Sequence, residues 1–428
     1  MFAQTLATYL TRRGIHYAWV IAAVTFFAML TTSAALGLPG AMLKPLSREF
    51  GWTTDQLSSA FAVRFVLFGL LGPFAAIFIN RFGLRRVMVV ASSCIALAML
   101  LSTRMTALWQ LFVLWGLVLG CGTGLTALVL GAMVASRWFT ARRGLVVGML
   151  AASTATGQLI FLPVAAWLIS HVGWRYAVIP VVVACIAVIV AVLLFMQNQP
   201  ADIGLRAYGE NDDSPSPPTP TPAAPLNFRG PFIMLAEAAH NRTFWILAGT
   251  FFICGLSTNG LIQTHFISLC GDYGLAAVPA ASVLSMMGAF DLVGTTLSGY
   301  LSDRFDNRML LFWYYGLRGL SLFLLPFSPF TLYGLSLFAL FYGLDWIATV
   351  PPTVKLTAQA FGRERAGLVF GWVFAAHQLG AAVAAYGAGL TRTLLLTYEP
   401  AVFAAGMACL VAAIAVTAIQ QSTKKEGT

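Results

Sequence analysis

Long apolar runs are the feature that most constrains this chain, because about 20 consecutive apolar residues can cross a lipid bilayer as one helix. Runs of that length, bounded by charges, glycine, proline or aromatic residues, predict twelve spans. Their approximate limits are 17–40, 56–79, 87–103, 107–134, 144–170, 174–196, 243–268, 279–302, 309–327, 330–356, 366–391 and 399–420. Only 9% of the residues are charged, too few to cover a soluble globule. The sequence therefore predicts an all-α protein that crosses the lipid bilayer many times.

The chain also carries one pattern twice. Adding 223 to the residue number carries the turn Asn80–Arg85 onto Asp303–Arg308, and the segment Arg142–Gly148 onto Arg365–Gly371. One constant shift for two separate segments indicates two copies of one unit, a pattern typical of transporters whose site lies between two repeats.

Six spans precede and six follow a polar stretch, so we divide the chain into three parts. These are an N-terminal six-helix bundle (1–196), a cytoplasmic Pro-rich linker (197–241) and a pseudo-symmetric C-terminal six-helix bundle (242–428). The linker is expected to be disordered, above all at Asp212–Pro225, which is too polar and Pro-rich to bury itself. Pro231–Ala239 is predicted to be either a short amphipathic helix at the membrane interface or a plain loop.

Lysine and arginine residues outside the spans are distributed unevenly. Seventeen lie on the side of the two termini and the linker, and five lie on the other side. The positive-inside rule then predicts a multi-pass protein of the cytoplasmic (inner) membrane with both termini in the cytoplasm. The net charge of +10 comes from short turns rather than from a basic patch, so we expect no nucleic-acid partner. We also expect a monomer.

The short basic turn after the second span of each copy is the strongest motif and the candidate gating loop. Glycine near the end of a span lets adjacent helices approach closely, and cations at helix ends can hold carboxylates or the last carbonyls of a helix. The candidate residues are Gly72, Arg81, Arg85 and Arg86 in the first copy, and Asp303, Arg304 and Arg308 in the second. The alternative is that these residues only fix the topology.

On these residues the sequence resembles the major facilitator superfamily, whose loop between the second and third helices carries a Gly, an Asp-Arg pair, another Gly and a basic pair. The resemblance implies twelve helices in two bundles that transport a substrate by alternating access. Asn80 stands where the family usually has Asp, and Asp306 stands where Gly is usual. The missing carboxylate at Asn80 argues against a charge relay in the first turn, but it leaves the fold assignment intact.

Within that superfamily, the details are most similar to monocarboxylate porters and oxalate/formate-type carriers. The residues that carry this similarity are Tyr17-Ala18-Trp19-Val20, Arg137-Trp138-Phe139, Arg142-Arg143-Gly144-Leu145 and Phe290-Asp291-Leu292-Val293. The resemblance implies a small anionic substrate. Monocarboxylate porters typically carry Arg four residues after that Asp, whereas this chain has Thr295. The cation that binds a carboxylate must therefore come from elsewhere, or the substrate is not a simple monocarboxylate.

Arg64 is the candidate for that cation, because a charge in a lipid-length helix is costly and tends to mark function. The repeat maps Arg64 onto Met287, one helical turn before Asp291. We therefore expect Arg64 to bind the substrate, Asp291 to carry a proton, and the two side chains to face one another's half at similar depth. The alternative for both residues is a structural pair.

Three further residues extend the predicted site. His377 lies in the middle of the eleventh span beside Gln378, and its repeat partner is Thr154, so all three are candidates for substrate binding. The alternative for His377 is a hydrogen-bonded packing role. Asp345 is a second candidate for proton coupling, or the ion-pair partner of Arg318 in the ninth span, and we favour that pairing.

Signatures of catalysis are missing from the sequence. It contains no phosphate-binding loop, metal-ligand cluster or nucleophile constellation, so we expect no enzyme activity, no cofactor and no metal. The six cysteines lie almost entirely inside apolar segments and are expected to pack there. The sequence thus predicts a secondary active transporter for a small organic anion, a mono- or dicarboxylate, with proton coupling. The alternatives are a proton-driven exporter of drugs or metabolites, an anion exchanger without proton coupling, and a non-transporting sensor, which the intramembrane charges disfavour.

Overall fold

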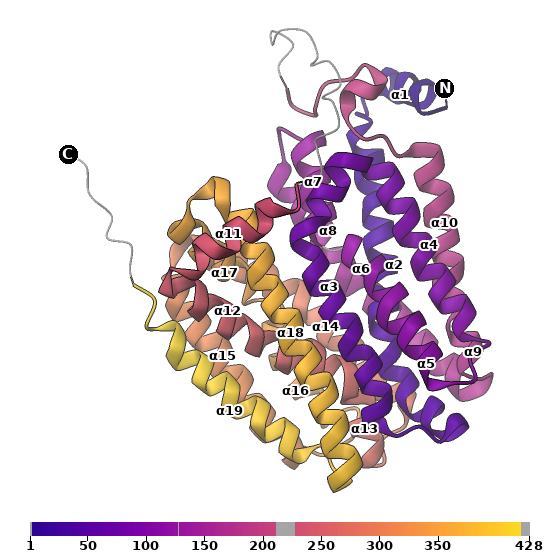
Figure 1. The fold of residues 1–428 in the computed structure, drawn as a ribbon, viewed down its shortest axis with the longest axis vertical. Helices are drawn as coiled ribbons and strands as arrows, with labels where there is room; N and C mark the ends of the chain where they lie inside the picture. Colours follow the sequence, from indigo (N-terminus) through magenta and orange to yellow (C-terminus); the bar gives the residue numbers. More distant parts are fainter. Residues whose placement is uncertain (1, 127, 211–226, 421–428) are drawn as a thin grey trace. The chain divides into compact units, whose positions relative to one another are not determined.

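The computed structural model describes residues 2–126, 128–210 and 227–420. Twelve helices in these residues are long and apolar enough to cross a membrane, which confirms the predicted number of spans. The described chain is almost entirely helical (Figure 1). Its one pairing of β type is an isolated bridge between Phe139 and Tyr208.

The residues form two compact units. Unit 1 comprises Met1–Leu38 and Phe74–Phe228, and unit 2 comprises Pro39–Pro73 and Arg229–Thr428. Two long helices are shared between the units, α2 (Ala18–Phe50) and α3 (Thr54–Phe82). The last part of α2 and the first part of α3 thus belong to unit 2, although the sequence repeat counts both spans in the first copy.

Beside its parts of α2 and α3, unit 1 contains ten elements. They are α1 (Phe2–Arg12), α4 (Leu84–Ser102), α5 (Leu108–Leu111), the π-helical η1 (Phe112–Val118), α6 (Leu119–Leu125), α7 (Leu128–Trp138), α8 (Arg143–His171), α9 (Trp174–Ala177), α10 (Ile179–Phe195) and the 3-10 helix η2 (Pro200–Ile203). Its apolar core includes Tyr17, Met29, Met88 and Trp138. Helix α1 is strongly amphipathic and buries Ala3 and Ala7 against this core.

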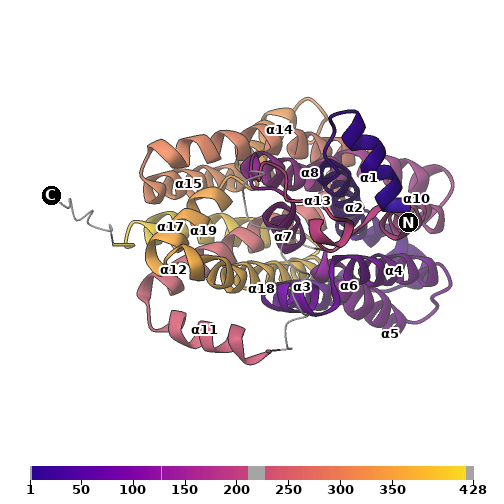
Figure 2. The ribbon, with the colours of Figure 1, turned by 90° about the horizontal axis from the view of Figure 1, so that it is seen from above.

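Unit 2 contains the remaining helices and its parts of α2 and α3. They are α11 (Arg229–Ala239), α12 (Arg242–Gly255), the π-helical η3 (Leu256–Gln263), α13 (Thr264–Asp272), α14 (Ala277–Arg304), α15 (Asn307–Leu324), the 3-10 helix η4 (Leu325–Phe327), α16 (Ser336–Asp345), α17 (Val350–Phe361), α18 (Arg363–Leu395) and α19 (Glu399–Val416). Helix α11 lies across the direction of its neighbour α18 (Figures 1 and 2). It confirms a helix in the segment predicted as either helix or loop.

The tenth span is interrupted between α16 and α17, at residues 346–349. Proline at 351 and 352 explains the break, because neither ring nitrogen can donate to the carbonyl four residues earlier. The Ala348 carbonyl, which Pro352 leaves without a helical donor, instead accepts from Ser298 Oγ at 2.6 Å. The interruption leaves backbone groups inside unit 2 that side chains can bind.

The repeat is visible in how each unit packs. In unit 1, a Cβ on Gly157 of α8 would overlap the Leu30 carbonyl oxygen of α2. In unit 2, a Cβ on Gly380 of α18 would overlap the Phe252 carbonyl oxygen of α12 in the same way. Gly157 and Gly380 are the residues that the 223 shift superimposes, so the same close helix contact occurs in both copies.

The predicted linker is partly folded. Residues 197–210 belong to unit 1 and include η2. The Tyr208 backbone N–H donates to Trp138 O at 2.8 Å, and its carbonyl accepts from Thr140 N at 2.9 Å. The aromatic rings of Trp19 and Phe139 each lie 5.8 Å from the Tyr208 ring, which gives this segment an apolar anchor that its polar sequence did not suggest. The predicted disordered stretch at Asp212–Pro225 lies outside the described residues.

Candidate functional site

A buried ion pair lies at the centre of unit 2. Arg318 of α15 is 1% exposed, and its Nε donates to Asp345 Oδ2 at 2.5 Å. Its Nη2 donates to the backbone carbonyls of Asp345 and Trp346 at 2.5 and 3.2 Å, at the interruption of the tenth span. The pairing of Arg318 with Asp345 that the sequence favoured is therefore confirmed.

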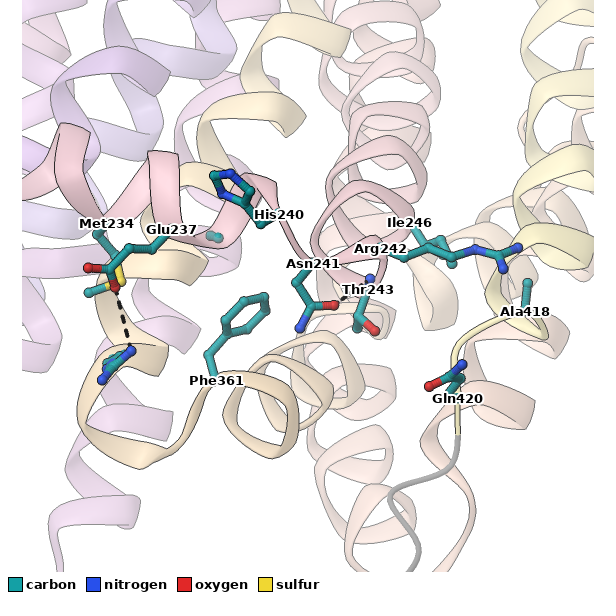
Figure 3. A pocket seen from close by; sticks show the side chains of 12 residues that line it. Met234, Glu237, His240, Asn241, Arg242, Thr243, Ile246, Phe361, Ala418 and Gln420 are labelled. Atoms are coloured by element: carbon teal, nitrogen blue, oxygen red, sulfur yellow. Dashed lines mark hydrogen bonds and ion pairs between the residues drawn. The ribbon is translucent and has the colours of Figure 1, made fainter.

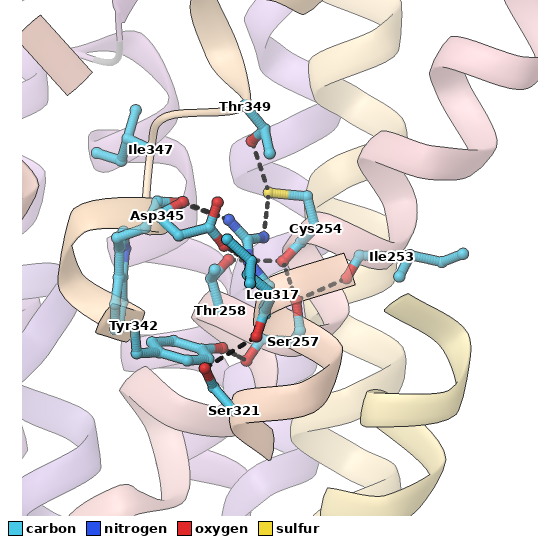
Figure 4. A network of polar contacts seen from close by, with 12 residues as sticks. Ile253, Cys254, Ser257, Thr258, Leu317, Ser321, Tyr342, Asp345, Ile347 and Thr349 are labelled. Carbon is cyan, nitrogen blue, oxygen red and sulfur yellow. Dashed lines mark hydrogen bonds and ion pairs between the residues drawn. The ribbon is translucent and has the colours of Figure 1, made fainter. Parts of the chain in front are cut away.

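Cys254 of α12 extends this network (Figure 4). Arg318 Nη1 donates to its Sγ at 3.0 Å, and Thr349 Oγ1 lies 3.3 Å from the same sulfur. The His377 side chain also interacts with this thiol. The sequence predicts Cys254 to be a packing residue, but Ser257 and Thr258 follow it one helical turn later. That polar face within a span was the signal that the cysteine has polar neighbours.

Asp291 of α14 lies next to the same interruption. Its Oδ1 accepts from the Ile347 backbone N–H at 2.9 Å and from Thr295 Oγ1 at 2.8 Å. Thr295 occupies the position at which the resembled porters have Arg, so a neutral hydroxyl replaces that cation. Arg318 is the cation that acts electrostatically on Asp291, without a direct hydrogen bond. Asp291 is thus bonded by neutral donors.

Arg64 lies elsewhere in unit 2, on α3. It is 1% exposed, and its guanidinium carbon lies 4.6 Å from the centre of the Phe65 ring. Phe65 packs against three alanines of α18, namely Ala381, Ala382 and Ala385. Asp291 faces the interrupted tenth span instead, and the described interactions of its carboxylate do not include Arg64. The two side chains thus have different described neighbours, and their expected placement at similar depth stays a prediction.

His377 and Gln378 lie on two faces of α18. Gln378 is 1% exposed and faces α3, where its Cβ lies 2.6 Å from the position of a Cβ on Gly69. The His377 ring lies 4.8 Å from the Phe251 ring of α12. Among the described residues, Gln378 Oε1 and His377 Nδ1 have no hydrogen-bond partner. Buried polar atoms without a partner are costly, and in a transporter they are positions at which a substrate or water can bind.

Thr154, the repeat partner of His377, belongs to unit 1 and lies on α8. Its hydroxyl donates to Ala151 O at 2.7 Å in its own helix, and its carbonyl accepts from Ser33 Oγ at 2.5 Å. The Thr154 side chain is half-buried. Its hydroxyl can still accept a hydrogen bond, because a hydroxyl has acceptor capacity left after donating.

The first basic turn is held by amide and arginine contacts within unit 1. Arg137 Nη2 donates to Asn80 Oδ1 at 2.6 Å, and Arg85 donates from its backbone to Asn198 Oδ1 at 3.1 Å and from Nη2 to Leu193 O at 2.5 Å. Arg81 and Arg86 are exposed. Asn80 therefore keeps the position of an acceptor for arginine although it carries no charge.

The corresponding turn in unit 2 uses charges. Lys355 Nζ pairs with the Asp303 carboxylate, and Arg308 pairs with Asp306 at 2.6 Å while also donating to Ile419 O at 2.9 Å. Arg304 stacks over the Tyr300 ring at 4.2 Å. Asn80 and Asp303 occupy equivalent positions in the two repeats. Each is bound by a cation from the fourth span of its own repeat, Arg137 for Asn80 and Lys355 for Asp303. Gly72 lies apart from these turns, in unit 2, where a Cβ would approach Phe374 Cδ1 to 3.8 Å.

At the end of unit 2 opposite this turn, the Asp272 carboxylate forms ion pairs with two cations. The sequence predicts no partner for either cation. Asp272 pairs with Lys44 at 3.0 Å and with Arg392 at 2.7 Å. Nearby, Thr393 Oγ1 donates to Asp55 Oδ1 at 2.8 Å. These contacts tie the end of α2 and the start of α3 to α13 and α18. The sequence carries no local signal for them, because the partners are far apart along the chain.

Comparison with known proteins agrees with this architecture. The family model described as Major Facilitator Superfamily matches residues 21–385. The chain is 25% identical over 380 residues to the uncharacterized MFS-type transporter YcxA of Bacillus subtilis (strain 168), with 87% of this chain and 88% of that protein covered. It is 24% identical over 394 residues to monocarboxylate transporter 13 of Rattus norvegicus, with 91% and 86% covered.

A solved structure shows the same fold. The crystal structure of a D-xylose-proton symporter matches with a TM-score of 0.74 at 14% identity, over 95% of this chain and 99% of that one. The present chain has twelve candidate spans in its described residues, the same helix packing in both copies, and a family match over most of its length. It is therefore a membrane transporter of the Major Facilitator Superfamily.

Proposed function

We propose that this transporter is a secondary active carrier of a small organic anion, a mono- or dicarboxylate, driven by a proton. Relatives named monocarboxylate transporters, at 23–26% identity, support the class of substrate. The observation that carries the proposal is a fully buried Arg64 on α3, next to Phe65, which packs against α18, together with the unpartnered carbonyl oxygen of Gln378 on α18. A buried guanidinium can bind a carboxylate with two parallel hydrogen bonds.

In unit 2, the proposed substrate-binding residues are Arg64, Gln378 and His377. In unit 1, Thr154, the repeat partner of His377, is a proposed substrate-binding residue by that relationship. Arg64 supplies the positive charge. Gln378 and His377 supply polar atoms that fix the orientation of the anion and of any hydroxyl or keto group next to its carboxylate.

Asp291 is the proton carrier in this proposal. A carboxylate held by two neutral donors can exist in a buried site as the neutral acid, whereas one bonded to a guanidinium stays ionised. Asp345 is the second proton-coupling group of the proposal. It is bonded to Arg318 and stays ionised in that pair, so it takes up a proton only when the pair separates. The basic turns at Arg81 and Asp303 hold each bundle together while the transporter changes conformation.

The orientation completes the proposal. The excess of lysine and arginine on one side supports cytoplasmic termini and an inner-membrane location. The proposed carrier acts as a monomer.

Uptake of labelled mono- and dicarboxylates into proteoliposomes, with and without an imposed proton gradient, tests the function. We expect accumulation only with the gradient. Equal uptake under both conditions would assign an anion exchanger instead, and no uptake of any carboxylate would overturn the class of substrate.

A further inference from the structure

A cavity of about 470 Å³ lies in unit 2 between helix α11 and the bundle, outside the site described above. Four chain segments line it, as Figure 3 shows: the end of α11, the start of α12, the junction of α17 with α18, and the residues after α19. Phe361 points into its middle and forms an apolar floor, and Arg242 extends toward Ala418 at its side (Figure 3). Residues from four separate segments of unit 2 therefore form this one cavity.

Two of the three charged side chains that line this cavity are basic. Among the described lining residues, Arg242 and Arg365 lie with His240, and Glu237 is the one carboxylate. Arg365 Nη1 lies 3.5 Å from Glu237 Oε2, and both side chains are more than half exposed, so this contact is weak and leaves most of the guanidinium available. Helices α12 and α18 both begin here, and their N-terminal ends add partial positive charge. The net positive charge around the cavity therefore favours the binding of an anion.

The same region has the surface of a helix at the membrane boundary. Trp372 Nε1 donates to Pro231 O at 2.9 Å and so fixes α11 to α18. Phe232 and Ile233 of α11 remain 55% and 56% exposed, and Trp245 of α12 is 61% exposed with its Nε1 bonded to Ala239 O. Exposed aromatic and aliphatic side chains beside a basic cavity are typical of the interface between lipid tails and headgroups.

We propose that this cavity binds the phosphate headgroup of an anionic phospholipid. Arg242 and Arg365 hold the phosphate, and Phe232, Ile233 and Trp245 contact the acyl chains. A free phosphate ion has the same headgroup chemistry but would gain nothing from those exposed apolar residues. The lipid would link α11, and hence the end of the linker, to the cytoplasmic ends of α12, α17 and α19. This site is independent of the substrate site proposed above.

Native mass spectrometry of the full-length protein in detergent, titrated with phosphatidylglycerol or phosphatidylcholine, tests the proposal. We expect one tightly bound phosphatidylglycerol, and about 30-fold weaker binding of it in the double variant Arg242→Gln/Arg365→Gln, because two cations near an anionic lipid contribute about 1 kcal/mol each. Arg12→Gln/Arg13→Gln removes the same charge from the end of α1 and the residue after it, in unit 1, and is the matched control that should bind the lipid like the parent.

A gain of affinity gives an independent readout if the double variant does not fold. Glu237→Gln removes the competing carboxylate and should strengthen phosphatidylglycerol binding. The proposal is overturned if phosphatidylcholine binds equally well, if both Arg double variants lose affinity equally, or if Glu237→Gln leaves the affinity unchanged. Displacement of the lipid by millimolar inorganic phosphate would instead assign the cavity to a free anion.

Discussion

Arg318 and Asp291 bind to the same interrupted turn of the tenth span, from two different helices. Arg318 donates to the carbonyls of Asp345 and Trp346, and Asp291 accepts from the N–H of Ile347. The backbone carbonyls of the interrupted turn thus accept from the Arg318 guanidinium, and one backbone N–H of the same turn donates to the Asp291 carboxylate. A change in the charge of Asp291 acts directly on the backbone segment that also holds the Arg318–Asp345 pair.

The first prediction concerns that buried pair. Arg318→Met and Asp345→Leu should each destabilise the protein by about 3–5 kcal/mol, because either change leaves one buried charge without its partner. The double variant Arg318→Met/Asp345→Leu should recover part of the folded protein. Yield of monodisperse protein in detergent gel filtration measures all three, and single variants that elute like the parent would show that the pair does not stabilise the fold.

Arg64 is expected to be required for substrate binding. Arg64→Ala should abolish it, and Arg64→Lys should bind weakly, because an ammonium offers a point charge where the planar guanidinium offers two parallel donors. The measurement is substrate protection against thermal unfolding, with Arg48→Ala, which removes an exposed cation of α2, as the control. Normal protection in Arg64→Ala would remove Arg64 from the binding site.

Asp291→Asn should separate exchange from accumulation. The amide keeps the shape of the side chain but cannot carry a proton, so counterflow exchange should remain while proton-driven accumulation disappears. Thr295→Val is the matched variant, because it removes one neutral donor to the carboxylate and keeps the acid itself. Accumulation against a gradient by stable Asp291→Asn protein would assign proton coupling to another group.

Two glycines of α18 should respond differently to the same substitution. Gly380→Ala places a methyl group against the Phe252 carbonyl and should cost about 1–3 kcal/mol or more, whereas Gly387→Ala meets nothing within 4 Å. Thermal unfolding of both variants in detergent measures the difference. Equal stability of the two would contradict the close contact between α12 and α18.

His16 should make the folded linker segment sensitive to pH. Its Nδ1 accepts from Ala18 N at 3.2 Å and its ring lies 5.6 Å from that of Tyr208, and burial lowers the pKa of the imidazole. A base held neutral in the folded state contributes stability above its unfolded pKa, about 6.5, and loses that contribution as the pH falls below it. Acidification should therefore loosen residues 199–210.

Hydrogen exchange of residues 199–210 at about pH 7.5 and about pH 5.5 measures this effect, on either side of the ordinary histidine pKa. His16→Asn is the control, because an Asn can accept the same bond, as Asn241 does from Thr243 N at 2.8 Å, and does not titrate. At the lower pH the parent should exchange faster than His16→Asn, and equal exchange of the two would show that His16 does not hold Tyr208.

Local sequence patterns determined the spans and the repeat. Apolar length predicts which segments can cross a bilayer, and a constant shift of 223 relates Gly157 to Gly380, which the structure then places in equivalent helix contacts. The Arg318–Asp345 pair was also predictable, because two opposite charges in neighbouring spans have few other partners in an apolar interior. Each of these inferences depends on position along a helix axis, which the residue number gives directly.

The tertiary structure decided what each helix face meets. Residue number alone placed Arg64 and Asp291 at similar depth, but the packing of α3 on α18 and the interruption beside Pro351 gave them different neighbours. Cys254 likewise became part of a polar network only because α12 and α15 turn those faces toward one another. The rotation of a helix about its axis results from the packing of all its neighbours together, and no short stretch of sequence contains that information.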